Sequence, residues 1–214
     1  MSKIDEVAAA VQAGKAKLVP GLVQEALDEG CPAVDILNIG MIGAMGVVGE
    51  KFKNNEIFVP EMLVAARAMK KGVDVLKPHL AGDDAVSRGK YILGTVAGDL
   101  HDIGKNLVGM MIESAGFEVI DLGVDVPAEK FVETIKANPD CKLIGLSALL
   151  TTTMPAMKDA VAAIIEAGLH DQVTIMVGGA PISQEFCDEI GADAYTSDAA
   201  SAAEKAKELA DAMK

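Results

Sequence analysis

The segment Gly98-Asp99-Leu100-His101-Asp102-Ile103-Gly104-Lys105-Asn106 has the most distinctive chemistry in this chain. His101 lies between a predicted buried strand and a predicted helix, and open α/β sheets bind ligands at the carboxyl ends of their strands. Metal-ligating histidines usually donate their second ring N–H to a carboxylate or carbonyl, and Asp99 is placed to accept it. Gly98 and Gly104 have no side chains, so a bulky group can approach the backbone closely there. The arrangement suits a histidine that ligates a metal from below a flat cofactor.

The other polar residues near this histidine have simpler interpretations. Asp102 is a competing acceptor for the imidazole, but it lies where the helix starts, so we expect it to face solvent or to cap that helix. A lone histidine more often has a structural role, and the position of His101 after a strand is what favours a functional one. His79 and His170 have no such neighbours and are predicted to be surface residues.

Two further clusters follow predicted strands. The run Ser147-Ala148-Leu149-Leu150-Thr151-Thr152-Thr153 has four hydroxyls, of which one is expected to cap the next helix, while the others suggest polar contacts to a ligand. The pair Gly178-Gly179 allows close backbone approach to a bulky group, although a tight turn explains it equally well.

The segment after the first predicted strand does not match the common nucleotide-binding motifs. Five residues separate Gly98 from Gly104 and Asn106 follows Lys105, whereas a phosphate-binding loop needs four residues and then Ser or Thr. The glycine fingerprint of dinucleotide-binding folds is also missing after the first strand. A receiver-like module with Asp99 as phosphoacceptor stays open, although the usual acidic cluster after the first strand is not evident.

Composition limits the class of protein. The 214 residues carry a formal net charge of −13 without a basic stripe, so nucleic acid is not an expected partner. The cysteines Cys31, Cys141 and Cys187 lie far apart, which favours a reducing compartment over metal ligation. No apolar run reaches the roughly 18 residues that span a bilayer, and the N-terminus lacks a signal-peptide core. We expect a cytoplasmic protein with no membrane association.

Two sequence patterns divide the chain into residues 1–87 and 88–214. In the first part, apolar residues at spacings of three and four predict four helices. These are residues 4–13, residues 18–27, a helix starting near Pro32 and reaching Phe52, and one from Val59 to Leu76. Short connections between four helices predict a small bundle. The segment Pro78–Gly89, rich in Pro, Gly, Asp and Ser, is the predicted linker.

The second part alternates between strand and helix patterns. The predicted strands are residues 91–97, 118–122, 143–148, 174–177 and 194–196. The predicted helices are residues 104–115, 127–137, 154–167, 183–190 and 199–213. Five such units predict a doubly wound, flavodoxin-like parallel sheet of order 2-1-3-4-5, with its ligand crevice between strands one and three.

These motifs together resemble a known family. Asp99-x-His101-x-x-Gly104, Ser147 with Thr151, and Gly178-Gly179 resemble the cobalamin-binding domain of methionine synthase and its relatives. Residues 40–52 and 57–62 resemble that family's helical cap. The resemblance covers nearly the whole chain. Without a further catalytic domain, it points to the small corrinoid proteins of anaerobic methyltransferase systems.

The resemblance assigns roles by position. It implies that His101 is the lower axial ligand of cobalt in place of the cofactor's own base, that Asp99 holds this histidine and shares a proton with it, and that Thr153 takes the place of a relay serine. It further places these residues around the cofactor: Gly98, Asp102, Ile103, Gly104, Ser147, Leu149, Thr151, Gly178, Gly179, Tyr195, Asp198 and Ala199. Phe52 and Val59 match apolar residues that cover its upper face.

The function that the resemblance implies is methyl carriage in one-carbon metabolism on a cobalamin, as methylcobalamin or a related corrinoid. A substrate:corrinoid methyltransferase loads the cobalt, and a corrinoid:tetrahydrofolate or corrinoid:coenzyme M methyltransferase unloads it. A reductive activase is a further implied partner, and the linker is the implied hinge. The chain alone should show little turnover. The methyl donor stays open among methanol, methylamines, quaternary amines and methoxylated aromatics.

Two other cobalamin-dependent classes remain as alternatives. The cobalamin-binding subunit of a mutase shares the histidine motif but lacks this helical cap. A cobalamin-dependent sensor has both domains, but it would need a DNA-binding segment, and its light-sensing versions carry a Trp that this chain lacks.

Overall fold

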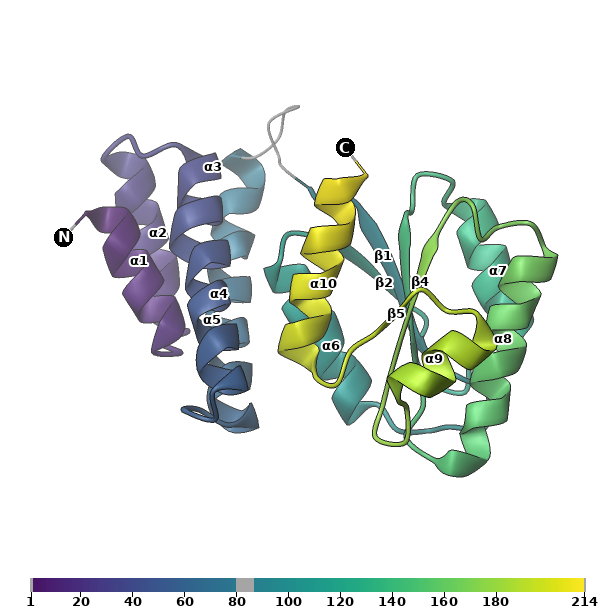
Figure 1. The fold of residues 1–214 in the computed structure, drawn as a ribbon. Coiled ribbons are helices and arrows are strands. Elements are labelled where there is room, and N and C mark those ends of the chain that lie inside the picture. The colour runs from purple at the N-terminus through teal and green to yellow at the C-terminus, as the bar shows by residue number, and fades with distance from the viewer. Residues whose placement is uncertain (1, 80–86, 214) are drawn as a thin grey trace. The chain divides into compact units, whose positions relative to one another are not determined.

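A computed structural model describes residues 2–79 and 87–213 of the chain (Figure 1). The chain forms two compact units, a helical one made largely of residues before Arg88 and an α/β one made largely of residues from Arg88 on. The predicted linker, Pro78–Gly89, falls mostly on residues 80–86, which lie outside the described residues.

The helical unit has the predicted four-helix order. Its elements are α1 (Lys3–Gln12), α2 (Val19–Asp28), the continuous helical run of α3 (Ala33–Asp35), η1 (Ile36–Ile42) and α4 (Gly43–Lys53), then α5 (Val59–Leu76) and the short η2 (Lys77–His79). Apolar side chains at helical spacing meet in its core, where Val7, Val23, Met41 and Met62 are fully buried. Pro32 precedes the third helix and Pro60 lies in the first turn of α5, as expected for prolines at helix starts.

The third helix contains a π-helical segment that apolar spacing does not reveal. Over η1 the backbone widens, and the N–H of Gly43 donates to the carbonyl of Asn38, five residues back. A spacing of four between apolar residues fits both helix types, so the sequence pattern predicted one uninterrupted α-helix here. Such segments are rare, and they often mark functional positions.

Sequence reasoning expected no apolar run of membrane-spanning length, but by length and composition the same run, Ala33–Lys53, is long and apolar enough to cross a membrane. It is nonetheless a packed element of the helical unit, because it contacts α1 and α5 and buries Ile36, Met41 and Val48. A core helix of a soluble bundle passes the same test of length and composition, so the run is weak grounds for a membrane segment.

The α/β unit has the predicted sheet. The parallel strands are β1 (Lys90–Thr95), β2 (Glu118–Asp121), β3 (Leu143–Ser147), β4 (Thr174–Gly178) and β5 (Ala194–Tyr195), in the order β2-β1-β3-β4-β5. Strand β1 ends two residues before the predicted limit at Ala97. Beyond Thr95 only Val96 keeps a ladder contact, a single bridge to Val126, because the chain then turns at Gly98.

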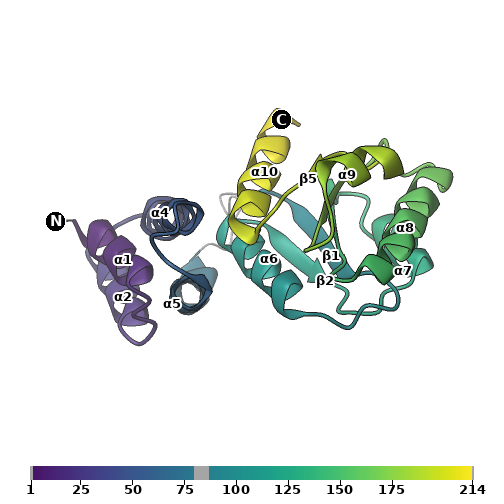
Figure 2. The ribbon, with the colours of Figure 1, turned by 60° about the horizontal axis from the view of Figure 1, so that its bottom comes forward.

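Helices cover both faces of this sheet. They are α6 (Ile103–Ser114), α7 (Ala128–Ala137), α8 (Met154–Glu166), α9 (Gln184–Ile190) and α10 (Ala199–Ala212). Figures 1 and 2 show α6 and α10 on one face and α7, α8 and α9 on the other. Successive residues of β1 point to opposite faces of the sheet, so neighbouring residues meet helices on different faces. Leu93 packs against α6 at Gly109, while Gly94 leaves room on the other face for Phe131 of α7.

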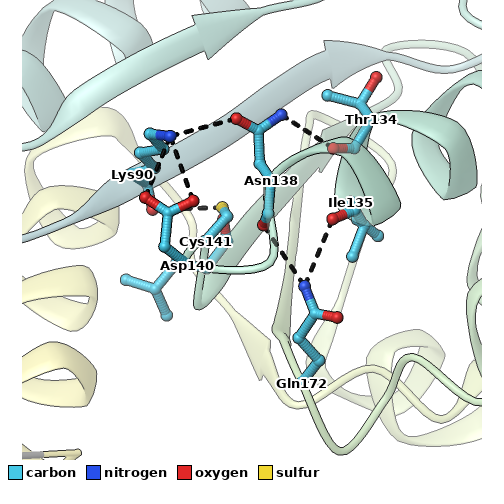
Figure 3. A network of polar contacts seen from close by, with 8 residues as sticks. Lys90, Thr134, Ile135, Asn138, Asp140, Cys141 and Gln172 are labelled. Carbon is cyan, nitrogen blue, oxygen red and sulfur yellow. Dashed lines mark hydrogen bonds and ion pairs between the residues drawn. The ribbon is translucent and has the colours of Figure 1, made fainter.

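The amino end of the sheet is closed by a polar network (Figure 3). The ammonium of Lys90, at the start of β1, contacts Asn138 Oδ1 at 3.3 Å and Asp140 at 3.0 Å. The amide of Gln172 donates to the carbonyls of Ile135 and Asn138. This network ties β1 to the end of α7 at the edge of the sheet opposite His101.

At the carboxyl edge, Gly179 allows two chain segments to touch. Its φ is +134°, and a Cβ built there would overlap the carbonyl oxygen of Ala148. No side chain can fit without moving the turn that follows β3 or the turn that follows β4. Close packing of these two turns therefore requires Gly179, the glycine that sequence reasoning connected with a ligand, whether or not a ligand is bound.

We predict that Gly179→Ala lowers the free energy of unfolding by about 3 kcal/mol or more, because it adds overlap to backbone strain. Gly168→Ala is the matched control, since Gly168 also has a positive φ, +70°, but nothing lies within 4 Å of a Cβ built there. This control should lose only about 1–2 kcal/mol. Thermal unfolding of both variants checks the difference, and equal losses would contradict it.

Candidate functional site

The candidate site is built on the turn that leaves β1. The N–H of Asp99 donates to the carbonyl of Val96, and Gly98 has a φ of +78°. Because β2 and β3 flank β1 on opposite sides, the connection from β1 leads to one side of the sheet and the connections from β3 lead to the other. Open parallel sheets bind ligands at the point between β1 and β3 where the strand order reverses in this way. The turn therefore places Asp99 and His101 where the fold offers a crevice.

Asp99 is a fully buried carboxylate with four donors. Its Oδ1 accepts from the Nδ1–H of His101 at 2.7 Å and from the backbone N–H of His101 at 3.1 Å. Its Oδ2 accepts from the N–H of Leu149 and from the hydroxyl of Thr153, both at 2.7 Å. Sequence reasoning expected the pairing with His101, and the structure brings Thr153 to the same carboxylate.

These contacts determine the charge of Asp99. Burial raises the pKa of the carboxyl group, but the bonds from Leu149, Thr153 and His101 lower it by more, so the pKa lies far below its ordinary value. Asp99 is therefore ionised at neutral pH, and an ionised carboxylate only accepts hydrogen bonds.

That charge selects the tautomer of His101. Since Asp99 Oδ1 can only accept, Nδ1 of His101 carries the proton. In the neutral imidazole the lone pair then lies on Nε2. The side chain of His101 is 48% exposed, so this donor atom belongs to a residue that a ligand can reach.

Two residues that sequence reasoning missed hold the backbone of this turn. The hydroxyl of Thr95 donates to the carbonyl of His101 at 3.0 Å. Asp125 accepts from the N–H of Gly98 at 2.7 Å and donates its own N–H to the carbonyl of Asp99 at 3.0 Å. Thr95 had a weak signal, a hydroxyl in an apolar strand, whereas nothing local marks Asp125, which lies far along the chain.

Large apolar side chains next to His101 in the chain, and in the segment after β3 that contacts Asp99, are exposed. Leu100 is 72% and Ile103 is 78% exposed, and Leu149 and Leu150 are also exposed. Gly104 adds open space, because nothing lies within 4 Å of a Cβ built there. An exposed apolar patch next to a polar donor is typical of a ligand surface. Sequence reasoning included Ile103 and Leu149 but not Leu100 or Leu150.

The hydroxyl cluster after β3 differs from expectation in one respect. Thr153 is the N-cap residue of α8, but its side chain makes no capping bond. Its hydroxyl instead contacts Asp99 Oδ2 and, at 2.9 Å, the carbonyl of Leu150. Thr151 is exposed, and Ser147, the last residue of β3, is partly buried.

The remaining predicted residues of the α/β unit lie at the same edge of the sheet or on α6. Asp102 is exposed and accepts from the side chain of Asn106 at 3.1 Å. Gly178 ends β4, and Tyr195 ends β5, where it is partly buried.

The last two predicted residues lie at the start of α10. Asp198 caps this helix by accepting from the N–H of Ser201 at 2.8 Å. Burial raises the pKa of Asp198, but hydrogen bonds from Ser201 and Ser197 bring it below its ordinary value. Ala199 is buried.

Phe52 and Val59 belong to the helical unit, at the end of α4 and the start of α5, and both are partly exposed. Phe58, between them, is far more exposed, and its N–H donates to the carboxylate of Glu61 at 3.0 Å. All three residues are thus apolar and at least partly exposed, and they lie at or near the connection between α4 and α5.

His170 has a partner that sequence reasoning did not foresee. Its Nε2 lies 3.0 Å from Asp193 Oδ1, and Asp193 also accepts from the N–H of Ile175. This pairing joins the turn before β4 to the segment before β5, and local sequence cannot reveal it. His79 is exposed, as predicted.

The donor set decides what kind of metal group fits. Among residues 2–79 and 87–213, no three His, Cys, Asp or Glu side chains gather into a metal site. These described residues therefore offer no cluster of three or more ligands that could hold a bare ion. A flat macrocycle that brings most of its own metal ligands would fit instead, because the protein would need to add only one donor, for which His101 Nε2 is available, and an apolar surface such as the exposed Leu100 and Ile103.

Comparisons with known proteins agree with this fit. Two family models, both described as B12 binding domain, match residues 89–206 and residues 3–77. The fold and the site thus define a two-part corrinoid-binding protein.

Individual relatives match over nearly the full length. A corrinoid protein of Desulfitobacterium hafniense is 42% identical over 98% of both chains, and dimethylamine corrinoid protein 1 of Methanosarcina acetivorans is 44% identical over 96% of both. In a methanol:cobalamin methyltransferase complex from Methanosarcina barkeri, a chain superimposes with a TM-score of 0.84 at 30% identity, covering 99% of this chain and 79% of that one. The protein belongs to the corrinoid proteins with B12-binding domains, and its cofactor is a cobalamin-type corrinoid.

We predict that Thr153→Val destabilises the apoprotein by about 1.5–3 kcal/mol, because a buried charged acceptor loses a donor. Thr153→Ser keeps the hydroxyl and removes one methyl group, so it should lose about 0.8 kcal/mol. Urea unfolding at neutral pH measures both. A serine variant as unstable as the valine variant would show that packing, and not the bond to Asp99, accounts for the role of Thr153.

Proposed function

We propose that this protein carries a methyl group on its corrinoid between two methyltransferases. The observation that supports this most is the pair of Asp99 and His101, which presents an Nε2 lone pair among exposed apolar side chains. The names of its relatives agree: they include dimethylamine corrinoid proteins and a monomethylamine corrinoid protein of Methanosarcina barkeri, which is 39% identical with a TM-score of 0.56.

His101 is the proposed axial ligand, and Asp99 maintains its tautomer and orientation. When bound, the corrinoid supplies a cobalt ion that accepts a methyl group and gives it up. The protein's part is to hold the imidazole, to adjust its basicity through Asp99, and to present an apolar surface to the ring.

Thr153 gives Asp99 a way to take up a proton. A hydroxyl has one hydrogen, and Thr153 Oγ1 has two acceptors within reach, Asp99 Oδ2 at 2.7 Å and Leu150 O at 2.9 Å. With Asp99 ionised, the hydrogen points to Oδ2. If Oδ2 is protonated, the hydroxyl can turn to Leu150 and accept from Asp99. The site thus satisfies both protonation states without moving its backbone.

We assign residues 1–87 to a helical cap and residues 88–214 to the cobalamin-binding domain. The residues proposed to contact the corrinoid are Gly98, Asp99, His101, Asp102, Ile103, Gly104, Ser147, Leu149, Thr151, Gly178, Gly179, Tyr195, Asp198 and Ala199 from the second and Phe52 and Val59 from the first. Full-length likeness to corrinoid proteins favours a carrier over a mutase subunit or a sensor.

The proposed partners are a methyltransferase that loads the corrinoid, one that unloads it to tetrahydrofolate or coenzyme M, and a reductive activase. The relatives' names favour methylamines or methanol as donors. We propose a cytoplasmic location, supported by three free cysteines, Cys31, Cys141 and Cys187.

We predict that the cobalt(II) form of the reconstituted protein shows nitrogen coupling from His101 in its electron spin resonance spectrum. Protein labelled with heavy-nitrogen histidine should change the splitting, and His101→Ala should abolish that isotope effect. His170→Ala is the matched control, because His170 also pairs with a carboxylate, Asp193, and should keep the effect.

Carrier function has its own test. Wild-type protein incubated with a methylamine or methanol methyltransferase and the substrate should gain the spectrum of methylcobalamin, whereas the His101→Ala variant should gain it more slowly. An isotope effect that persists in His101→Ala would disprove ligation by this residue, and no methylation by any donor system would disprove the carrier role.

A further inference from the structure

Lys105 is a buried cation next to the site that the proposed function does not use. Its side chain is 2% exposed, and it is the third residue of α6. Lysine is rarely buried without a partner, and the amino end of a helix disfavours positive charge. A specific contact must offset both effects.

Lys105 finds that contact on a neighbouring strand. Its ammonium forms an ion pair with Asp121 Oδ2, and Asp121 is the last residue of β2. The other carboxylate oxygen, Oδ1, accepts from the N–H of Gly123 at 2.8 Å, which holds the carboxylate in place. The pair thus fastens the first turn of α6 to the carboxyl end of β2.

The contacts continue from Lys105 toward the histidine. The ammonium also donates to Asn106 Oδ1 at 2.8 Å, and the amide of Asn106 donates to Asp102 Oδ2 at 3.1 Å. Asp102 is the neighbour of His101, and its carbonyl accepts from the N–H of Asn106 at 2.7 Å. A continuous polar chain therefore runs from β2 to the residue beside His101.

The loop that carries His101 is consequently held at both ends. At the β1 end, Thr95 and Asp125 hold its backbone. At the α6 end, the only charged side chain that is buried among residues 103–114 is Lys105. Movement of the first turn of α6 would move the carbonyl and ring of His101 relative to Asp99.

We propose that Lys105 and Asp121 form a positioning pair for His101, which keeps its Nε2 at the place where it meets cobalt. The pair acts through the backbone of α6 and does not touch the metal. This inference rests on the ligation by His101 under the proposed function.

The chain contains a matched control at the opposite edge of the sheet. Lys90 contacts an aspartate, Asp140, and an asparagine oxygen, Asn138 Oδ1, as Lys105 contacts Asp121 and Asn106 (Figure 3). Lys90→Met removes the same kinds of contact far from the turn. It therefore reports what loss of a lysine–aspartate–asparagine cluster does to the fold alone.

The experiment compares Lys105→Met, Asp121→Asn and Lys90→Met, each reconstituted with cobalamin and reduced to cobalt(II). The measured quantity is the ratio of histidine-bound to histidine-free cobalt, from the isotope-dependent spin resonance signal, with thermal unfolding of the apoprotein alongside. We expect this ratio to fall about tenfold in Lys105→Met and Asp121→Asn, the lower end of the effects of outer ligand partners, and to stay unchanged in Lys90→Met.

Each outcome decides between explanations. If Lys105→Met fails to fold, Asp121→Asn carries the test, because Asp121 is 44% exposed and its replacement leaves no cavity. A wild-type ratio in Asp121→Asn, or an equal fall in Lys90→Met, would overturn the positioning role while His101 ligation stands. If the wild type itself shows no histidine signal, ligation fails and the positioning role fails with it.

Discussion

The buried carboxylate of Asp99 is the interaction on which the site depends. It accepts four hydrogen bonds from three stretches of chain: the turn after β1, the segment after β3 and the start of α8. A charge this deep is tolerated because each oxygen has two donors. The same bonds lower the pKa of Asp99 and put the proton of His101 on Nδ1. One carboxylate therefore determines the orientation, the tautomer and the accessible donor atom of the histidine.

The amino edge of the sheet has a structural polar network, whereas the carboxyl edge carries the candidate site. At the amino edge, Lys90, Asn138 and Gln172 join β1 to the end of α7 in a network of ordinary structural contacts. At the carboxyl edge, polar groups converge on Asp99, and the leucine and isoleucine side chains of the segments that carry His101 and Leu149 are exposed. Gly179 shows how closely the turns of that edge pack, since the space where its side chain would be is filled by the carbonyl of Ala148. Rigid backbone around a reachable imidazole suits a protein whose cofactor does the chemistry.

The parts of the fold that depend on local pattern could be predicted from the sequence. Hydrophobic periodicity predicted the four helices, and the alternation of five strand and helix patterns predicted the order of the strands. The spacing of Asp99 and His101 predicted their bond. Contacts between distant residues could not be predicted. Asp125 supports Gly98 from 27 residues away, and His170 meets Asp193 across 23. The expected capping role for a hydroxyl after β3 was wrong at Thr153, because a buried charge attracts that hydroxyl more strongly than a helix end does. The π-helical segment η1 could not be predicted either, because its apolar residues have the same spacing as those of an α-helix.

The distance in sequence between Asp99 and its donors has a consequence for biogenesis. Leu149 and Thr153 lie 50 and 54 residues after Asp99, on the far side of strand β3. During synthesis, a ribosome that has released only the first βα unit exposes His101 without the groups that orient it. The bonds that orient His101 through Asp99 are therefore complete only after β3 has joined β1 and Thr153, at the start of α8, has left the ribosome.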